Sequence, residues 1–147
     1  MVDFYHVAEK LMIPDLQDMI MGCLLRFQKA QNQLPSLEFI RRAYEETTEN
    51  GKLRLYAVFA LHYLMKQTDR NEEIWPLDEI SAIIQNCDGV CKDFLLLSMK
   101  QETADPRNLG VCTYHMHGLE DICPVTGKRS GGDRKPASGD GERPAKR

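Results

Sequence analysis

Two cysteines and two histidines lie within twelve residues of one another, in the segment CTYHMHGLEDIC of this 147-residue chain. They are Cys112, His115, His117 and Cys123. Thiolates and neutral imidazoles are the ligands that tetrahedral zinc prefers in proteins. We therefore expect either one zinc ion or no cofactor at all.

The spacing of these four residues suits zinc only in part. Two residues separate Cys112 from His115, as in zinc-binding turns, but a single residue separates His115 from His117. Five residues lie between His117 and Cys123, where an ordinary zinc finger has about a dozen. Two interpretations stay open: a polar loop whose Cys and His reflect local composition, which the spacing favours, and a zinc site.

Motifs for other chemistry are absent from the sequence. It contains no Gly-rich phosphate loop, no G-x-S-x-G nucleophile elbow and no H-E-x-x-H zinc motif. Its paired carboxylates are adjacent in sequence, which directs them to different faces of a helix. We expect a non-enzymatic protein with no catalytic residues.

The five cysteines are an odd number, and no apolar secretory segment begins the chain. Both features indicate a reducing, intracellular compartment, the cytoplasm or the nucleus. Cys23, Cys87 and Cys91 lie within helical patterns, so we expect them to be buried thiols.

Apolar residues at helical spacing predict the elements that must position the Cys/His segment. In residues 2–11 the predicted stripe is Phe4, Val7, Ala8 and Leu11, and Pro14 starts a second helix. Further helices are expected over 37–44, 52–67, 77–84 and, with Asp88 as N-cap, up to about residue 101. Residues 52–67 are apolar on most faces, which is typical of a central buried helix. The sequence predicts an all-α array of about six helices in antiparallel pairs.

The charge is distributed unevenly along the chain. Residues 127–147 hold seven Lys/Arg against three acidic residues and no large apolar side chain, whereas residues 1–126 carry a net charge of −7. Such a tail is expected to be disordered, because it cannot bury enough apolar surface to offset backbone ordering. No apolar run approaches the roughly 18 residues of a membrane helix, so we expect no membrane partner.

The opening residues resemble the last helices of a BTB/POZ domain, in which a Y-x-x-A-[ED]-K turn precedes [IV]-P-x-L. The matching residues are Tyr5, Ala8, Glu9, Lys10, Ile13, Pro14 and Leu16. The following segment, LPSLEFIRRAYEETTENGKLRLYAVFALHYL, resembles the helical extension of fungal-type BTB proteins. The resemblance covers residues 3–99 and divides the chain into a helix pair (1–33), a helical extension (34–103), a Cys/His loop (104–126) and the basic tail (127–147).

The strands and helices of the BTB N-terminal half are missing from this chain. We therefore expect a C-terminal fragment, a product of a truncated gene or a shortened relative, without the usual BTB dimer surface. The resemblance also implies a Cys-x-x-His-x-His…Cys segment near this position, which favours zinc.

The resemblance implies a protein-interaction module, in which adaptor-like binding to a cullin-type ligase or self-association would be the activity. Without the sheet half, the residues Phe4, Val7, Leu11 and Phe27 are expected to be exposed and to form a partner-binding face. The alternative is a small zinc-stabilised, nucleic-acid-associated protein that uses the Cys/His segment and the basic tail, which the acidic main body disfavours. A third possibility is a product without retained activity.

Overall fold

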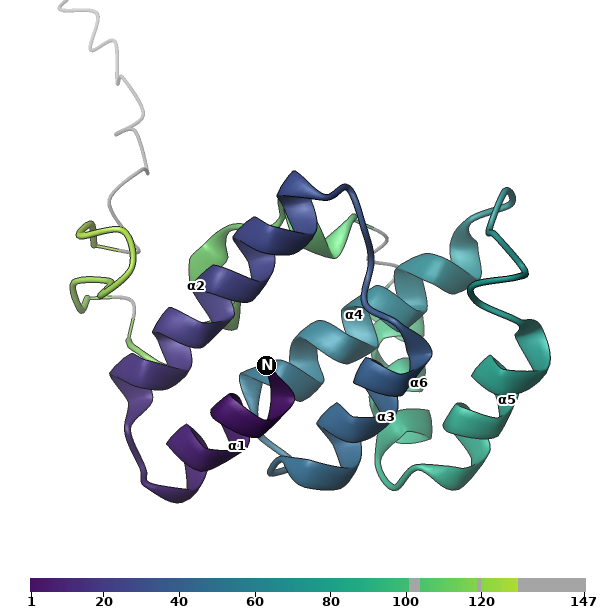
Figure 1. Ribbon diagram of the computed structural model, residues 1–147, viewed down its shortest axis with the longest axis horizontal. Helices are drawn as coiled ribbons and strands as arrows, with labels where there is room; N and C mark the ends of the chain where they lie inside the picture. Colours follow the sequence, from purple (N-terminus) through teal and green to yellow (C-terminus); the bar gives the residue numbers. More distant parts are fainter. Residues whose placement is uncertain (101–103, 119, 130–147) are drawn as a thin grey trace, which may run out of the picture.

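Six α-helices and two short 3₁₀ helices form the described part of the chain (Figure 1). The computed structural model describes residues 1–100, 104–118 and 120–129, in which the only β-type pairing is one isolated bridge between Ile122 and Arg129. The predicted all-α fold with six helices is confirmed. The elements are α1 (Val2–Lys10), α2 (Pro14–Ala30), α3 (Leu37–Glu46), α4 (Lys52–Lys66), α5 (Leu77–Asn86), α6 (Val90–Lys100), η1 (Pro106–Asn108) and η2 (Val111–Tyr114).

The starts of the helices follow local sequence signals. Pro14 occupies the first turn of α2, where its missing N–H leaves no helical hydrogen bond unmade. Ser36 caps α3, because its hydroxyl oxygen accepts a hydrogen bond from the Phe39 amide at 3.2 Å. The α6 N-cap was predicted wrongly at Asp88. The helix begins at Val90, after Gly89, whose positive φ of 85° suits a residue without a Cβ.

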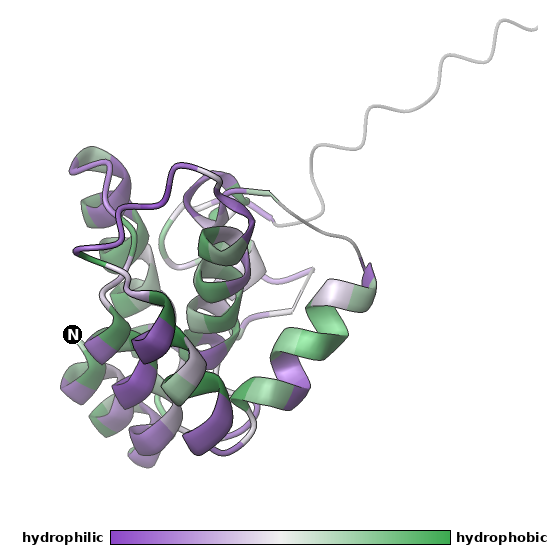
Figure 2. Cartoon of the chain, turned by 90° about the vertical axis from the view of Figure 1, so that its right-hand side faces the viewer, coloured by the Kyte–Doolittle hydropathy of each residue, from purple (hydrophilic) through white to green (hydrophobic). Residues whose placement is uncertain are grey.

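Helix α4 is the centre of the body, as its apolar sequence predicts. It packs against α3 and α6 and also contacts η1 and η2. Its buried side chains come from all around the helix: Leu53, Tyr56, Ala57, Val58, Ala60, Leu61, His62 and Leu64. Figure 2 shows hydrophobic and hydrophilic stretches alternating along the helices of this body.

Helix α1 packs against α2 and α3 with a different face from the predicted one. It buries Val2, Tyr5 and Ala8, so Ala8 is the one member of the predicted stripe that reaches the core. Phe4, Val7 and Leu11 are exposed, which confirms the exposure predicted for a chain without the sheet half. Both stripes recur at helical spacing, so periodicity alone does not decide between them.

Polar contacts hold α1 on the start of α4. The Tyr5 hydroxyl oxygen accepts a hydrogen bond from the Lys52 amide at 3.0 Å, which satisfies one of the free N–H groups at the helix N-terminus. Burial raises the pKa of Tyr5 to about 12. The Glu9 carboxylate accepts hydrogen bonds from the amide and the hydroxyl of Thr48 at 2.9 and 2.7 Å. Helix α1 is therefore joined to the body through its polar side chains as well as its apolar ones.

The cysteines differ from the prediction in part. None of the five, all of which lie in the described residues, forms a disulfide, but Cys23 and Cys91 are exposed and Cys87 is half-buried, so the expectation of buried thiols is wrong for the first two. Each helix turns another apolar side toward the core, which leaves these thiols on the outer face. Along the described residues, no helix has the length and apolar character needed to cross a membrane.

Candidate metal centre

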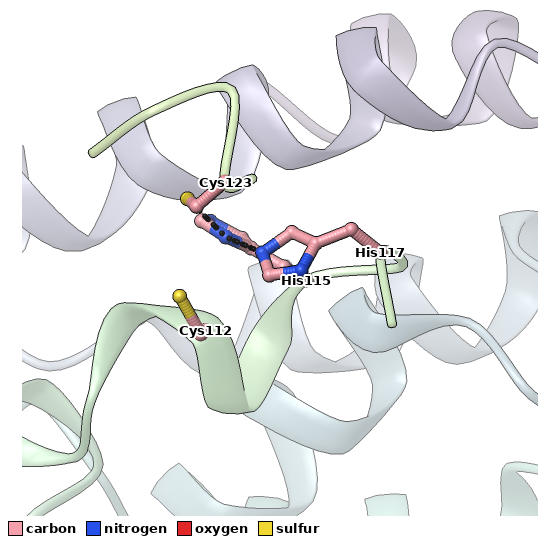
Figure 3. Close-up of side chains that lie close together, drawn as sticks. All are labelled: Cys112, His115, His117 and Cys123. Atoms are coloured by element: carbon pink, nitrogen blue, oxygen red, sulfur yellow. Dashed lines mark hydrogen bonds between the residues drawn. The ribbon is translucent and has the colours of Figure 1, made fainter. Parts of the chain in front are cut away.

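The four predicted ligand side chains converge at one point beside α2 (Figure 3). One ligand atom from each of Cys112, His115, His117 and Cys123 lies within 4.8 Å of every other. His115 and Cys123 are buried, and Cys112 and His117 are partly buried. Together the four side chains form a group that can hold a metal ion.

The first three ligands owe their placement to one short helix and the extended residue that follows it. Cys112 lies in η2, and the His115 amide donates a hydrogen bond to the Cys112 carbonyl at 3.3 Å, which brings the two residues onto one side of the turn. His115 itself is extended, with φ −103° and ψ 155°. The chain then bends at Met116 and His117, and this brings the His117 imidazole beside that of His115. The His115 Nδ1 and His117 Nε2 atoms are 3.2 Å apart.

The fourth ligand comes from a tight turn that folds back on itself. The Cys123 amide donates to the Lys128 carbonyl at 2.9 Å, and the Gly127 amide donates to the Cys123 carbonyl at 2.8 Å. Gly127 has a φ of 66°, in the left-handed region that a glycine enters at little cost. The turn includes residues 127–129, the start of the predicted tail, whereas 130–147 lie outside the described residues.

The surroundings of Cys123 and His115 favour the protonation states that bind metals. Burial alone raises the pKa of the Cys123 thiol, but hydrogen bonds, led by those from Thr126, outweigh it and lower that pKa to about 7. The Thr126 amide lies 3.4 Å from the sulfur. Burial lowers the pKa of His115, which keeps its imidazole neutral. The thiolate and the neutral imidazole are the forms that coordinate a metal ion.

The tautomer of His117 follows from its neighbour. Its Nδ1 lies 3.0 Å from the Gly118 carbonyl oxygen, an acceptor only, so we assign the proton to Nδ1. The hydrogen bond to this carbonyl raises the pKa of His117. The Nε2 lone pair is then directed at the cluster, an arrangement common among metal-binding histidines.

The segment that carries the ligands is packed on the helical body. In Figure 1 the green segments after α6 cross behind α2 and α4, and η1 and η2 both contact these two helices. Tyr114 is fully buried, and its ring meets Tyr56 and Phe59 edge-on at centroid distances of 5.3 and 6.2 Å. Val125 lies against Gly22 of α2, so closely that a Cβ on this glycine would be 2.8 Å from a Val125 methyl.

The four residues predicted to bind a partner lie elsewhere, on α1, at its C-cap and on α2. Phe4, Val7, Leu11 and Phe27, which we call the α1–α2 apolar face, are 69%, 51%, 61% and 59% exposed. None of the four belongs to the metal cluster. In the described residues, the Cys/His cluster is the single group of three or more possible ligands that converge closely enough to hold an ion.

Asp18 was not identified from the sequence as part of the site. This aspartate of α2 is 1% exposed, and its carboxylate accepts hydrogen bonds from the amides of Met116 and His117. A single acidic residue in a polar stretch of helix carries no signal of this contact. The turn at Cys123 does carry one, because Pro124 and Gly127 after a cysteine are typical of a tight turn.

Comparison of the chain with protein-family models, with curated proteins and with solved structures finds no match to any of them.

Proposed function

We propose that this chain is a non-enzymatic protein-interaction module whose C-terminal segment is fixed to the helical body by a structural zinc ion. The observation that carries the zinc proposal is the convergence of Cys112, His115, His117 and Cys123 within 4.8 Å. Two thiolates and two imidazoles form a ligand set typical of zinc.

The distances between ligand atoms fit tetrahedral coordination. With Zn–N of about 2.0 Å and Zn–S of about 2.3 Å, the edges of the tetrahedron are about 3.3 Å between two nitrogens and about 3.5 Å between nitrogen and sulfur. The His115 and His117 nitrogens are 3.2 Å apart, and His115 Nδ1 lies 3.4 Å from the Cys123 sulfur. Two of the six edges therefore already have the lengths that zinc requires.

Four protein ligands support a structural ion rather than a catalytic one. A catalytic zinc keeps a coordination position for water or substrate, whereas four protein ligands close the tetrahedron. The cluster also joins two irregular segments, residues 115–118 and the turn from Cys123 to Lys128. The geometry therefore supports a structural role, in which the ion fixes the C-terminal segment to the helical body.

Metal analysis of the purified full chain tests whether the cluster binds zinc. We expect close to one zinc ion per chain, lost in the Cys112→Ser variant. Cys91→Ser is the matched control, because Cys91 is an exposed thiol on α6, outside the cluster. A metal-free wild-type protein, or zinc retained in full by Cys112→Ser, would contradict the proposal.

The interaction part of the proposal rests on the α1–α2 apolar face. Large apolar side chains that are more than half exposed on two packed helices are typical of a contact surface. The likeness of residues 3–99 to the C-terminal part of fungal-type BTB/POZ proteins supports the same role. It suggests a cullin-type ligase, or a second copy of the chain, as the partner.

Two binding measurements test this face. We expect either concentration-dependent self-association in sedimentation, or binding to the purified N-terminal region of a cullin, to be lost in a Phe4→Ser/Phe27→Ser variant. Leu95→Ser is the control, because Leu95 is 56% exposed on α6. Absence of both activities in the wild type, or an equal loss in the control, would contradict the proposed role.

A further inference from the structure

The buried carboxylate of Asp18 contacts the backbone that carries the two histidine ligands. Its Oδ1 accepts the Met116 N–H at 2.5 Å, and its Oδ2 accepts the His117 N–H at 3.3 Å. These are the amides of the two residues that follow His115. Asp18 lies on α2, 98 positions earlier in the chain than Met116, and is 1% exposed.

A carboxylate so deeply buried requires compensation. Removing an ionised group from water is costly unless hydrogen bonds and opposite charge replace its hydration. Two amides supply the hydrogen bonds, but in the part of the chain that the structure describes no lysine or arginine forms an ion pair with Asp18. The two amides are therefore the compensation that the structure shows for this carboxylate, and both belong to the segment that carries the histidine ligands.

We propose that Asp18 is a positioning residue for the metal, which holds the backbone of Met116 and His117 in the conformation that lets both histidines coordinate the same ion. This inference rests on the metal binding proposed above. The chain bends at Met116 and His117 directly after His115, and Asp18 fixes the amides of both bend residues. Because two thiolates balance the charge of a divalent ion, the coupling between Asp18 and the metal acts through this backbone and not through net charge.

The contact also anchors the metal centre to the body. Asp18 is part of a regular helix that packs against α1, so its carboxylate is held on a rigid element. The turn of Cys123 contacts the same helix one turn further on, where Val125 meets Gly22. Three of the four ligands, the two histidines and Cys123, thus belong to segments that contact one side of α2.

Zinc affinity measured by competition with a chromophoric chelator tests the inference. We expect the Asp18→Asn variant to bind zinc about 10- to 100-fold more weakly, the range typical for loss of a group that orients metal ligands. The amide that replaces one carboxylate oxygen cannot accept a hydrogen bond. Asp15→Asn, an exposed aspartate on the same helix, is the matched control and should leave the affinity unchanged. Equal affinities of wild type and Asp18→Asn would overturn the inference.

Cobalt substitution separates positioning from a general loss of stability. We expect the visible absorption of bound Co²⁺ to change in Asp18→Asn and to remain that of the wild type in Asp15→Asn. Thermal unfolding gives a second criterion. The Asp18→Asn substitution should lower the unfolding midpoint more in the zinc-saturated wild-type chain than in the Cys112→Ser variant. An equal decrease of the midpoint in the two proteins means that Asp18 is only a structural residue, which contradicts the proposal.

Hydrogen exchange of the wild-type chain requires no variant and covers the case in which Asp18→Asn does not fold. The Met116 and His117 amides should be protected with zinc and lose protection when the metal is chelated, because the contact and the metal support each other. Protection that persists after chelation overturns the inference. A wild-type chain that binds neither zinc nor cobalt overturns the proposed function itself, so the two failures are distinguishable.

Discussion

The two faces of α2 both depart from the usual distribution of polar and apolar side chains. The face toward the metal centre and the core buries Asp18, Gly22 and Gln28 among its apolar side chains, whereas the opposite face leaves Met19 and Phe27 more than half exposed. In most surface helices the apolar stripe faces the core. The difference shows that specific partners, and not hydrophobicity alone, determine which side of this helix is covered.

Each unusual residue on the buried face meets a matching group. Asp18 accepts two amide hydrogen bonds from the ligand segment, and the side-chain oxygen of Gln28 accepts one from the Tyr56 hydroxyl at 2.8 Å. Gly22 leaves the space that Val125 fills. Buried polar groups are tolerated when they are hydrogen-bonded, so this face requires the segments that cover it.

The largest expected effect comes from removing the side chain of Tyr114, which anchors the ligand-carrying segment on the helical body. Tyr114 is fully buried against Tyr56 and Phe59, so Tyr114→Ala should lower the free energy of unfolding by about 3–5 kcal/mol, as expected for loss of a large core aromatic side chain. Urea unfolding monitored by circular dichroism measures the loss. Tyr114→Phe keeps the ring and removes only the 3.3 Å hydrogen bond to the Pro106 carbonyl, so it should cost much less. A Tyr114→Ala variant as stable as wild type would show that the segment contributes little to burial of this face.

A smaller effect is expected where the turn of Cys123 touches α2. Gly22→Leu places a side chain where Val125 already lies, and overpacking of this kind costs about 1–3 kcal/mol. The accompanying gain in helix propensity, below about 1 kcal/mol, does not offset that cost. Thermal unfolding at saturating zinc measures the loss, and zinc affinity should fall as the turn is displaced. Cys23→Leu, on the exposed face of the same helix, should leave both quantities near the wild-type values.

The helices could be predicted from the sequence because their signals are local. Pro14, Ser36 and the Asp88-Gly89 break lie at or close to the observed boundaries, and the apolar sequence of α4 identifies it as the central helix. The buried face of α1 could not be predicted, since its two apolar stripes both have helical spacing. Only packing against α2 and α3 selects Val2 and Tyr5 over the other stripe.

The metal centre could be predicted in its residues but not in its geometry. The spacing of His115 and His117 counts against zinc when ordinary finger spacing is the standard, yet the bend at Met116 and His117 brings the two ring nitrogens to 3.2 Å. The contribution of Asp18 depends on a contact between segments nearly a hundred residues apart, for which a single sequence holds no signal. The sequence therefore identifies the four metal ligands, but it does not identify Asp18, the distant residue that contacts their segment.

The smallest effect is expected at Phe27, which lies next to Gln28 in the sequence. Phe27 is exposed and Gln28 is buried, so the pair compares the two faces of α2. Gln28→Leu replaces a buried amide by an apolar group and leaves the Tyr56 hydroxyl without its acceptor, which should cost about 1–3 kcal/mol. Phe27→Gln replaces a phenylalanine that is 59% exposed, so its effect should stay within about 0.5 kcal/mol. Urea unfolding of the two single variants compares them directly. If Phe27→Gln proved the more destabilising, the exposed apolar face would be contributing to folding of the chain itself, and its proposed role as a partner surface would lose its support.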